Sequence, residues 1–93
     1  MTDVVLMKLV SGEEVIGRLA DTNEKALILE KARVLTVQPT PQGGMGLAML
    51  PFLMGDPEGK CSIMVEAVIG EIVGSIPPEL EKGYLQQTST IQL

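Results

Sequence analysis

The stretch LVSGEEVIGRLADTNEKALIL, residues 9–29, sets two glycines into an alternation of apolar and polar residues. Strand interiors ordinarily avoid glycine, and a glycine in mid-strand marks a sharp bend or a close backbone approach. Gly12 coincides with a turn signal, whereas Gly17 interrupts an alternation that places Val15 and Leu19 on one face. We therefore expect a tight first hairpin and a second strand that bends at Gly17, as a small curled sheet requires.

The period-two alternation predicts a mainly β chain. Strands are expected at residues 4–10, 13–21, 26–38, 47–54, 61–66 and 68–73. The pattern of the third strand slips near Glu30 and Lys31, which predicts a bulge or bend there. Pro51 confines the fourth strand to an edge or a bend. Short strands with hairpin signals favour a small antiparallel barrel or sandwich.

The C-terminal segment PPELEKGYLQQ, residues 77–87, has a different character. Its two prolines suit a first helical turn, and its early glutamates favour the positive end of a helix. Leu80, Tyr84 and Leu85 would form a narrow apolar stripe. We expect a short C-terminal helix, followed by a tail from Thr88 that frays or docks.

Composition limits the chemistry of the chain. Apolar residues make up 45% of the 93 residues, which excludes a disordered chain and fits one domain over residues 1–93. The chain has no histidine and one cysteine, Cys61, so it lacks the usual general base, the commonest metal ligand and any intrachain disulfide. We expect no enzymatic activity, no cofactor and no metal. A lone cysteine favours the reducing cytoplasm.

Charge and hydropathy indicate which partners to expect. The net charge of -5 counts against a strongly bound nucleic acid, because phosphate contacts supply most of such affinity. Residues 34–55 carry no charge, but prolines and glycines interrupt them, and their longest apolar run, residues 47–54, is too short to span a bilayer. No signal peptide is recognisable at the start of the chain. We therefore expect no membrane partner.

The segment KLVSGEEVIGRLADTNEKALIL resembles the first signature of Sm and Sm-like (LSm) proteins, hydrophobic-x-Leu-x-x-Gly-x-x-hydrophobic-x-Gly-x-Leu. Leu9, Gly12, Val15, Gly17 and Leu19 fall on this signature without a gap. MVEAVIGEIVGS is similar to the end of the Sm domain, notably that of bacterial Hfq. IPPELEKGYLQQ looks like the tail of small Sm-like proteins from T4-like marine phages, which would place the protein in the host cytoplasm. The resemblance covers a core of roughly residues 4–73 and leaves 74–93 as a C-terminal extension.

The resemblance implies a strongly bent, five-stranded antiparallel sheet. In this family the fourth strand pairs with the fifth strand of the next subunit, and the subunits close into a homo-oligomeric ring of about five to seven copies. CSIMVE and VIGEIV would supply these edges. The implied interface residues are Ser62, Met64, Val65, Val68, Ile69 and Glu71.

Family members commonly bind uridine-rich or adenine-rich single-stranded RNA. The corresponding loop positions fall on Asn23, Lys25 and Leu27, and Arg18 and Arg33 could add a basic patch. Leu27 offers no polar group to a base edge, and Lys25 offers no stacking face. An ordinary turn at Asn23 and Lys25 and a solvated basic face are the competing structural interpretations.

The place of the family's Arg-Gly turn is taken by Glu66-Ala67, whose carboxylate would repel phosphate. Two functions therefore stand side by side: a ring that binds RNA, and a ring that serves as a protein-interaction or assembly module. The chain also inserts residues 46–60 before its last strands. The methionine-rich segment 45–54 within this region is either packing or an adaptable surface for other proteins.

Overall fold

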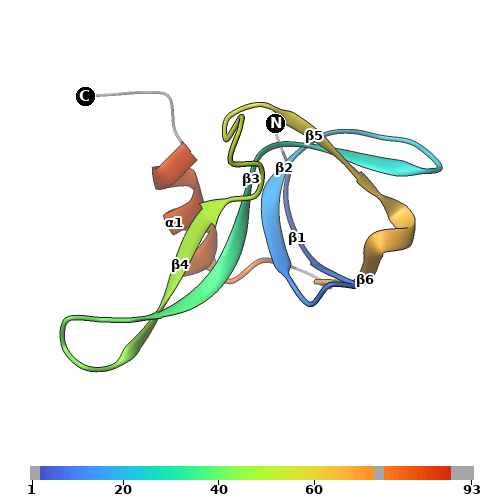
Figure 1. Cartoon of the computed structure of the whole chain (residues 1–93). Coiled ribbons are helices and arrows are strands. Elements are labelled where there is room, and N and C mark those ends of the chain that lie inside the picture. Colours follow the sequence, from blue (N-terminus) through green and yellow to red (C-terminus); the bar gives the residue numbers. More distant parts are fainter. Residues whose placement is uncertain (1–2, 73–74, 89–93) are drawn as a thin grey trace.

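A computed structural model describes residues 3–72 and 75–88 (Figure 1). Its elements are β1 (Asp3–Leu9), β2 (Glu14–Thr22), β3 (Ala26–Pro39), β4 (Met45–Pro51), β5 (Lys60–Met64), the 3-10 turn η1 (Val65–Ala67), β6 (Val68–Glu71) and α1 (Pro78–Thr88). The strands form one antiparallel sheet in the order β4-β3-β2-β1-β6, and β5 pairs with β3. The prediction of a bent, mainly β chain with a short C-terminal helix is confirmed.

The predicted irregularity at Glu30 and Lys31 is a bulge that divides β3 into two arms. Ile16 of β2 lies opposite Arg33, but Arg18 lies opposite Glu30, so β3 has an extra residue between these pairs. Lys31 has a left-handed backbone with φ 52°. Before the bulge β3 pairs with β5, and after it β3 pairs with β4 in a hairpin that projects from the curled sheet (Figure 1).

The two glycines of the opening stretch have the predicted roles. Gly12 has φ 95° in the turn between β1 and β2, where its N–H donates to the Leu9 carbonyl oxygen at 2.8 Å. Gly17 is buried within β2, and a Cβ atom there would lie 3.2 Å from Cδ1 of Leu29 and 3.4 Å from Cα of Ala32. Because real Cβ atoms seldom approach so closely, Gly17 lets β2 and β3 come together at the bend.

Both faces of the central strands are covered. Inside the curl lies an apolar cluster whose buried members are Met7, Leu9, Val15, Leu29, Ala32 and Ile63. On the opposite face, Ile16 and Tyr84 are fully buried. This arrangement explains why β2 has an apolar residue, Ile16, on the face opposite Val15.

The C-terminal helix differs from its predicted stripe. Tyr84 is fully buried and Leu80 is half-buried, but Leu85 remains 36% exposed. Thr88, one turn after Tyr84, is 1% exposed and takes the place expected for Leu85. The tail after Thr88 lies outside the described residues.

The predicted barrel is an open, curled sheet. Among the described residues, β5 pairs only with β3 and β6 pairs only with β1, so the two outer strands do not close on each other. The predicted strand 61–66 ends at Met64 because η1 follows, and β6 ends at Glu71. Residue 73, the predicted end of the last strand, lies outside the described residues.

Candidate functional site

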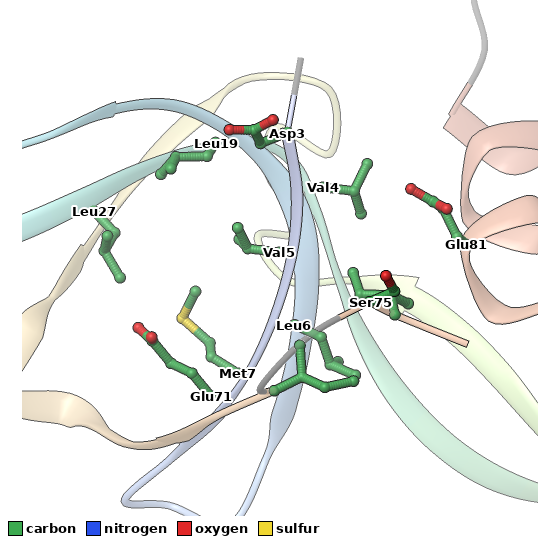
Figure 2. A pocket seen from close by; sticks show the side chains of 12 residues that line it. Asp3, Val4, Val5, Leu6, Met7, Leu19, Leu27, Glu71, Ser75 and Glu81 are labelled. Atoms are coloured by element: carbon green, nitrogen blue, oxygen red, sulfur yellow. The ribbon is translucent and has the colours of Figure 1, made fainter. Parts of the chain in front are cut away.

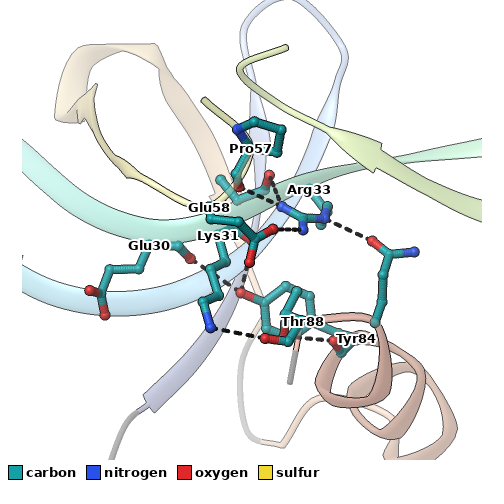
Figure 3. A network of polar contacts seen from close by, with 9 residues as sticks. Glu30, Lys31, Arg33, Pro57, Glu58, Tyr84 and Thr88 are labelled. Atoms are coloured by element: carbon teal, nitrogen blue, oxygen red, sulfur yellow. Dashed lines mark hydrogen bonds and ion pairs between the residues drawn. The ribbon is translucent and has the colours of Figure 1, made fainter. Parts of the chain in front are cut away.

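Arg33, a predicted RNA contact, lies in a buried polar network (Figure 3). Its Nε donates to Oε1 of Gln87 at 2.8 Å, and Nη1 donates to the Pro57 carbonyl oxygen at 2.8 Å. Its Nη2 lies 2.6 Å from Oε2 of Glu58. Because only 5% of the side chain is exposed, Arg33 presents no basic surface to a nucleic acid, and the expectation that it does is corrected. The guanidinium instead joins β3, the 55–59 loop and α1.

Tyr84 completes this network from α1. Its hydroxyl lies 2.9 Å from the carbonyl oxygen of Lys31 and 3.2 Å from that of Glu30, the two residues at the bulge. Lys31 Nζ donates to the Thr88 carbonyl oxygen at 2.9 Å, which satisfies a carbonyl group in the last turn of the helix. The bulge therefore offers two carbonyl groups to one phenol, and the helix end is fixed by a lysine of the sheet (Figure 3).

Arg18, another predicted RNA contact, lies near the Tyr84 hydroxyl. Burial raises the pKa of the Tyr84 hydroxyl, and the positive charges of Arg18 and Arg33 partly offset this increase. Arg18 therefore lies on the helix-covered face with Arg33. Its Nε is buried and has no hydrogen-bond partner among the described residues. Arg33 is buried and Arg18 is half-buried, so these two side chains do not form an open basic patch.

Asn23 and Lys25 occupy the turn between β2 and β3. The Oδ1 of Asn23 accepts hydrogen bonds from the N–H groups of Lys25 and Ala26, at 2.8 and 3.0 Å. This bonding makes the Asn23 side chain part of the turn itself. Lys25 is exposed, but it lies eight residues before Arg33 and on the other side of the bulge at Lys31. The structure does not bring the four predicted RNA contacts together.

The outer edge of β5 presents free backbone groups. The Lys31 N–H donates to the Gly59 carbonyl oxygen, and the Val65 N–H donates to the Lys25 carbonyl oxygen. These two bonds, at the two ends of the β3–β5 ladder, determine which residues of β5 direct their backbone groups toward β3. Cys61 and Ile63 therefore direct their backbone groups toward β3, and Ser62 and Met64 direct theirs outward. Met64 and Val65 are 48% and 42% exposed.

The second open edge belongs to β6. Ile69 is the extra residue at the register shift opposite Lys8 and Leu9 of β1, and its side chain is 62% exposed. Gly70 and Ile72 bond toward β1, so Glu71 directs its backbone groups outward. Of the six predicted interface residues, five are exposed and Val68 is half-buried. Thus the structure places all six on the two open edges or on η1, which links them.

A cavity of about 560 Å³ lies along β1 (Figure 2). Asp3, Glu71 and Glu81 contribute its charged side chains, and most of its other lining residues are aliphatic. Neither a basic nor an aromatic side chain lines it. The cavity therefore offers no partner to a phosphate group and no stacking face to a base.

Cys61, the one cysteine of the chain, lies in β5. Burial raises the pKa of the Cys61 thiol, which disfavours the reactive thiolate. Residues 3–72 and 75–88 contain no cluster of three or more metal-ligating side chains. The same residues contain no helix that is long and apolar enough to cross a membrane. No model of a known protein family matches the chain, and no curated protein matches it either.

Proposed function

We propose that the protein is an assembly module that joins its own copies head to tail through β5 and β6. One observation carries this proposal: among the described residues β5 and β6 each pair with one strand and leave one edge open, as β4 also does, and only the three residues of η1 separate β5 from β6 in the chain. An unpaired edge is a template for another strand. Pairing β5 of one copy with β6 of the next uses both edges. Repetition of this contact gives a closed ring when the rotation between neighbouring subunits divides a full turn evenly.

The exposed side chains support this assembly. Met64, Val65 and Ile69 are 48%, 42% and 62% exposed, and they belong to the two edges and η1. Exposed apolar groups that gather at one place usually mark a partner surface. In addition, Lys60 of β5 and Glu71 of β6 are exposed, so these two strands carry charges of opposite sign.

Membership of the Sm-like family is part of this proposal. It rests on the signature around Gly12 and Gly17 and on a matching strand plan, in which a 3-10 turn connects one edge strand to the other. By analogy with that family the ring would contain about five to seven copies. The lone Cys61 is in keeping with a cytoplasmic protein.

Protein assembly is supported better than RNA binding. The net charge is -5, Arg33 is buried in ion-pair and hydrogen-bond contacts, and the cavity along β1 lacks basic and aromatic groups. Each of these features weakens attraction for a phosphate backbone. A ring that binds proteins through its exposed apolar surfaces needs neither exposed basic groups nor aromatic groups.

Two complementary edge variants test the head-to-tail contact. Ser62→Pro removes an N–H that points away from β3, so it blocks the β5 edge and leaves the β3 ladder intact. Ile69→Lys places a charge on the β6 edge. We expect light scattering to show that each variant alone loses the ring. An equimolar mixture should form a complex that contains both variants and is heavier than either variant alone, because it retains one intact β5 edge and one intact β6 edge.

Val37→Lys is the matched control, since Val37 is also apolar and 58% exposed but lies on the projecting hairpin. This variant should keep the mass of the unmodified ring. The proposal is wrong if the unmodified protein is monomeric at every concentration. It is also wrong if the mixture of the two edge variants forms no complex heavier than each variant forms alone.

A further inference from the structure

We propose that the outer edge of β4 pairs with β4 of a second copy of the chain, antiparallel and across a two-fold axis at Leu47. This contact is separate from the β5–β6 contact and does not depend on it. Among the described residues β4 pairs only with β3, so its other edge is open. The hairpin that carries this edge projects from the curled sheet, where a second copy can reach it (Figure 1).

The hydrogen-bond register shows which groups β4 offers. The Phe52 N–H donates to the Ala32 carbonyl oxygen, and the Thr40 N–H donates to that of Gly44. These bonds lie at the two ends of the β3–β4 ladder and fix its alternation. Gly46, Ala48 and Leu50 therefore bond toward β3, which leaves Met45, Leu47 and Met49 with backbone N–H and C=O groups directed outward.

This set of outward groups is symmetric about Leu47. An antiparallel partner related by a two-fold axis would set Leu47 opposite its own copy and Met45 opposite Met49 of that copy. Each of these pairs would exchange both of its backbone hydrogen bonds. Pro51, which has no N–H, lies just beyond the paired residues. The open edge is thus complementary to itself over its full usable length.

The exposed apolar side chains on one face of the β3–β4 hairpin also favour pairing with a second copy. Val37 lies opposite Leu47 in the ladder, so the two share a face, and they are 58% and 65% exposed. Met45 is 65% exposed on the same face, whereas Met49 reaches α1, with its Cε 3.8 Å from the position of a Cβ at Gly83. Pairing of two β4 strands would bring Met45 beside Met49 and α1 of the other copy. Met45 would thereby be covered.

Charge identifies a second copy as the occupant. The chain has a net charge of -5, so most of its surfaces would repel the same surface of another copy. Residues 34–55 carry no charged side chain, and two copies can meet there without this repulsion. Edge strands are usually protected by charged residues, by proline within the strand or by a bulge, and β4 has just one of these, Pro51, at its last position.

The first experiment measures mass with the other contact blocked. In an Ile69→Lys background we expect light scattering to show a dimer, because β4 remains available. Adding Leu47→Lys should reduce the mass by half, since the pairing would place two ammonium groups opposite each other. Adding Val37→Lys instead should leave the dimer, because Val37 is on the inner strand of the hairpin. A monomer in the Ile69→Lys background overturns the inference, while a persistent ring there contradicts only the β5–β6 proposal.

The second experiment reports the register directly. In a Cys61→Ala background, Leu47→Cys should form an intermolecular disulfide under mild oxidation, because directly opposed Cα atoms lie about 5.5 Å apart, within the disulfide range. Val37→Cys should not, since the two Val37 positions would lie about 14 Å apart across three strand spacings. Equal cross-linking at both positions, or none at Leu47, overturns the inference. Co-sedimentation of the unmodified protein with phosphatidylcholine vesicles would assign the face to lipid and also overturn it.

Discussion

The two faces of β2 are stabilised by different interactions. Val15 and Gly17 face the inside of the curl, where the contacts are apolar and β3 approaches closely. Ile16 and Arg18 face α1, where charged and polar groups surround the buried Tyr84. The first face depends on shape alone, and the second depends on groups from β3, the 55–59 loop and α1 meeting at one place. This difference predicts different responses to substitution.

The largest effect is expected on the inner face. Gly17→Val should reduce the free energy of unfolding by about 1–3 kcal/mol, because the added atoms enter a space already limited by Leu29 and Ala32. Urea denaturation measures this loss. Gly17→Ala should give a smaller loss of the same sign, and Gly44→Ala should give almost none, since a Cβ there meets only Thr40 Oγ1 at 3.8 Å. An unchanged midpoint for Gly17→Val would contradict the proposed role of this glycine.

A somewhat smaller effect is expected from the polar network. Arg33→Met should reduce the free energy of unfolding by about 1–2 kcal/mol, because Gln87, Glu58 and the Pro57 carbonyl lose a shared charged donor. Hydrogen exchange should accelerate most in α1, which distinguishes this variant from Gly17→Val. Lys25→Met, at an exposed lysine, should change neither quantity. Uniform acceleration across the sheet in Arg33→Met would argue against a specific role in holding the helix.

Tyr84 adds a dependence on pH. Burial raises the pKa of its hydroxyl above the ordinary value of 10.0, so the folded chain retains this proton when the unfolded chain has lost it. The stability contributed by the neutral phenol is therefore complete below about pH 10 and decreases as the pH rises above that value. Tyr84→Phe should reduce the free energy of unfolding by about 1 kcal/mol at neutral pH. The alkaline loss of stability should be smaller in this variant, and an identical loss in both proteins would contradict the assignment.

The smallest expected effect is on nucleic-acid binding. Uridine-rich and adenine-rich oligonucleotides should show no salt-dependent affinity in gel shifts at low salt, because Arg18 and Arg33 are committed to the helix-covered face. Lys25→Ala should therefore change nothing. If the unmodified protein binds and Lys25→Ala weakens that binding, the basic groups have a function beyond support of the helix, and the division between the two faces fails.

The sequence predicts the inner face much better than the outer one. The local alternation of apolar residues and the glycine spacing predict β1, β2 and the bend at Gly17. The break in the alternation near Glu30 and Lys31 predicts the bulge. The network around Arg33 joins residues 54 and 25 positions apart, and no local pattern specifies such contacts. Consequently Arg33 was assigned to a basic surface. The sequence contained two related signals, the slip at Glu30 and Lys31 and the tyrosine at position 84. Their contact can be recognised only once the position of α1 against the sheet is known.

The six candidate edge residues were predicted through a family resemblance, and the structure places them on open strands or on η1. Pro51 indicated an edge or a bend for the fourth strand, but the sequence does not predict which backbone groups of β4 face outward, because their direction depends on the register with β3. Alternation in MGLAMLP does not reveal which residues face outward.

The extra residue at Lys31 separates the molecule into a body and an arm. Residues of β3 before it pair with β5 in the curled body, and Arg33–Leu35 after it still pair with β2. Only the part of β3 beyond Leu35 pairs with β4 alone and forms the arm. Since strands repeat every two residues, the arm can be shortened or lengthened by matched pairs on β3 and β4 without altering the body. The length of the β3–β4 arm can therefore change, by natural or designed insertions and deletions, without a change in the fold of the curled body.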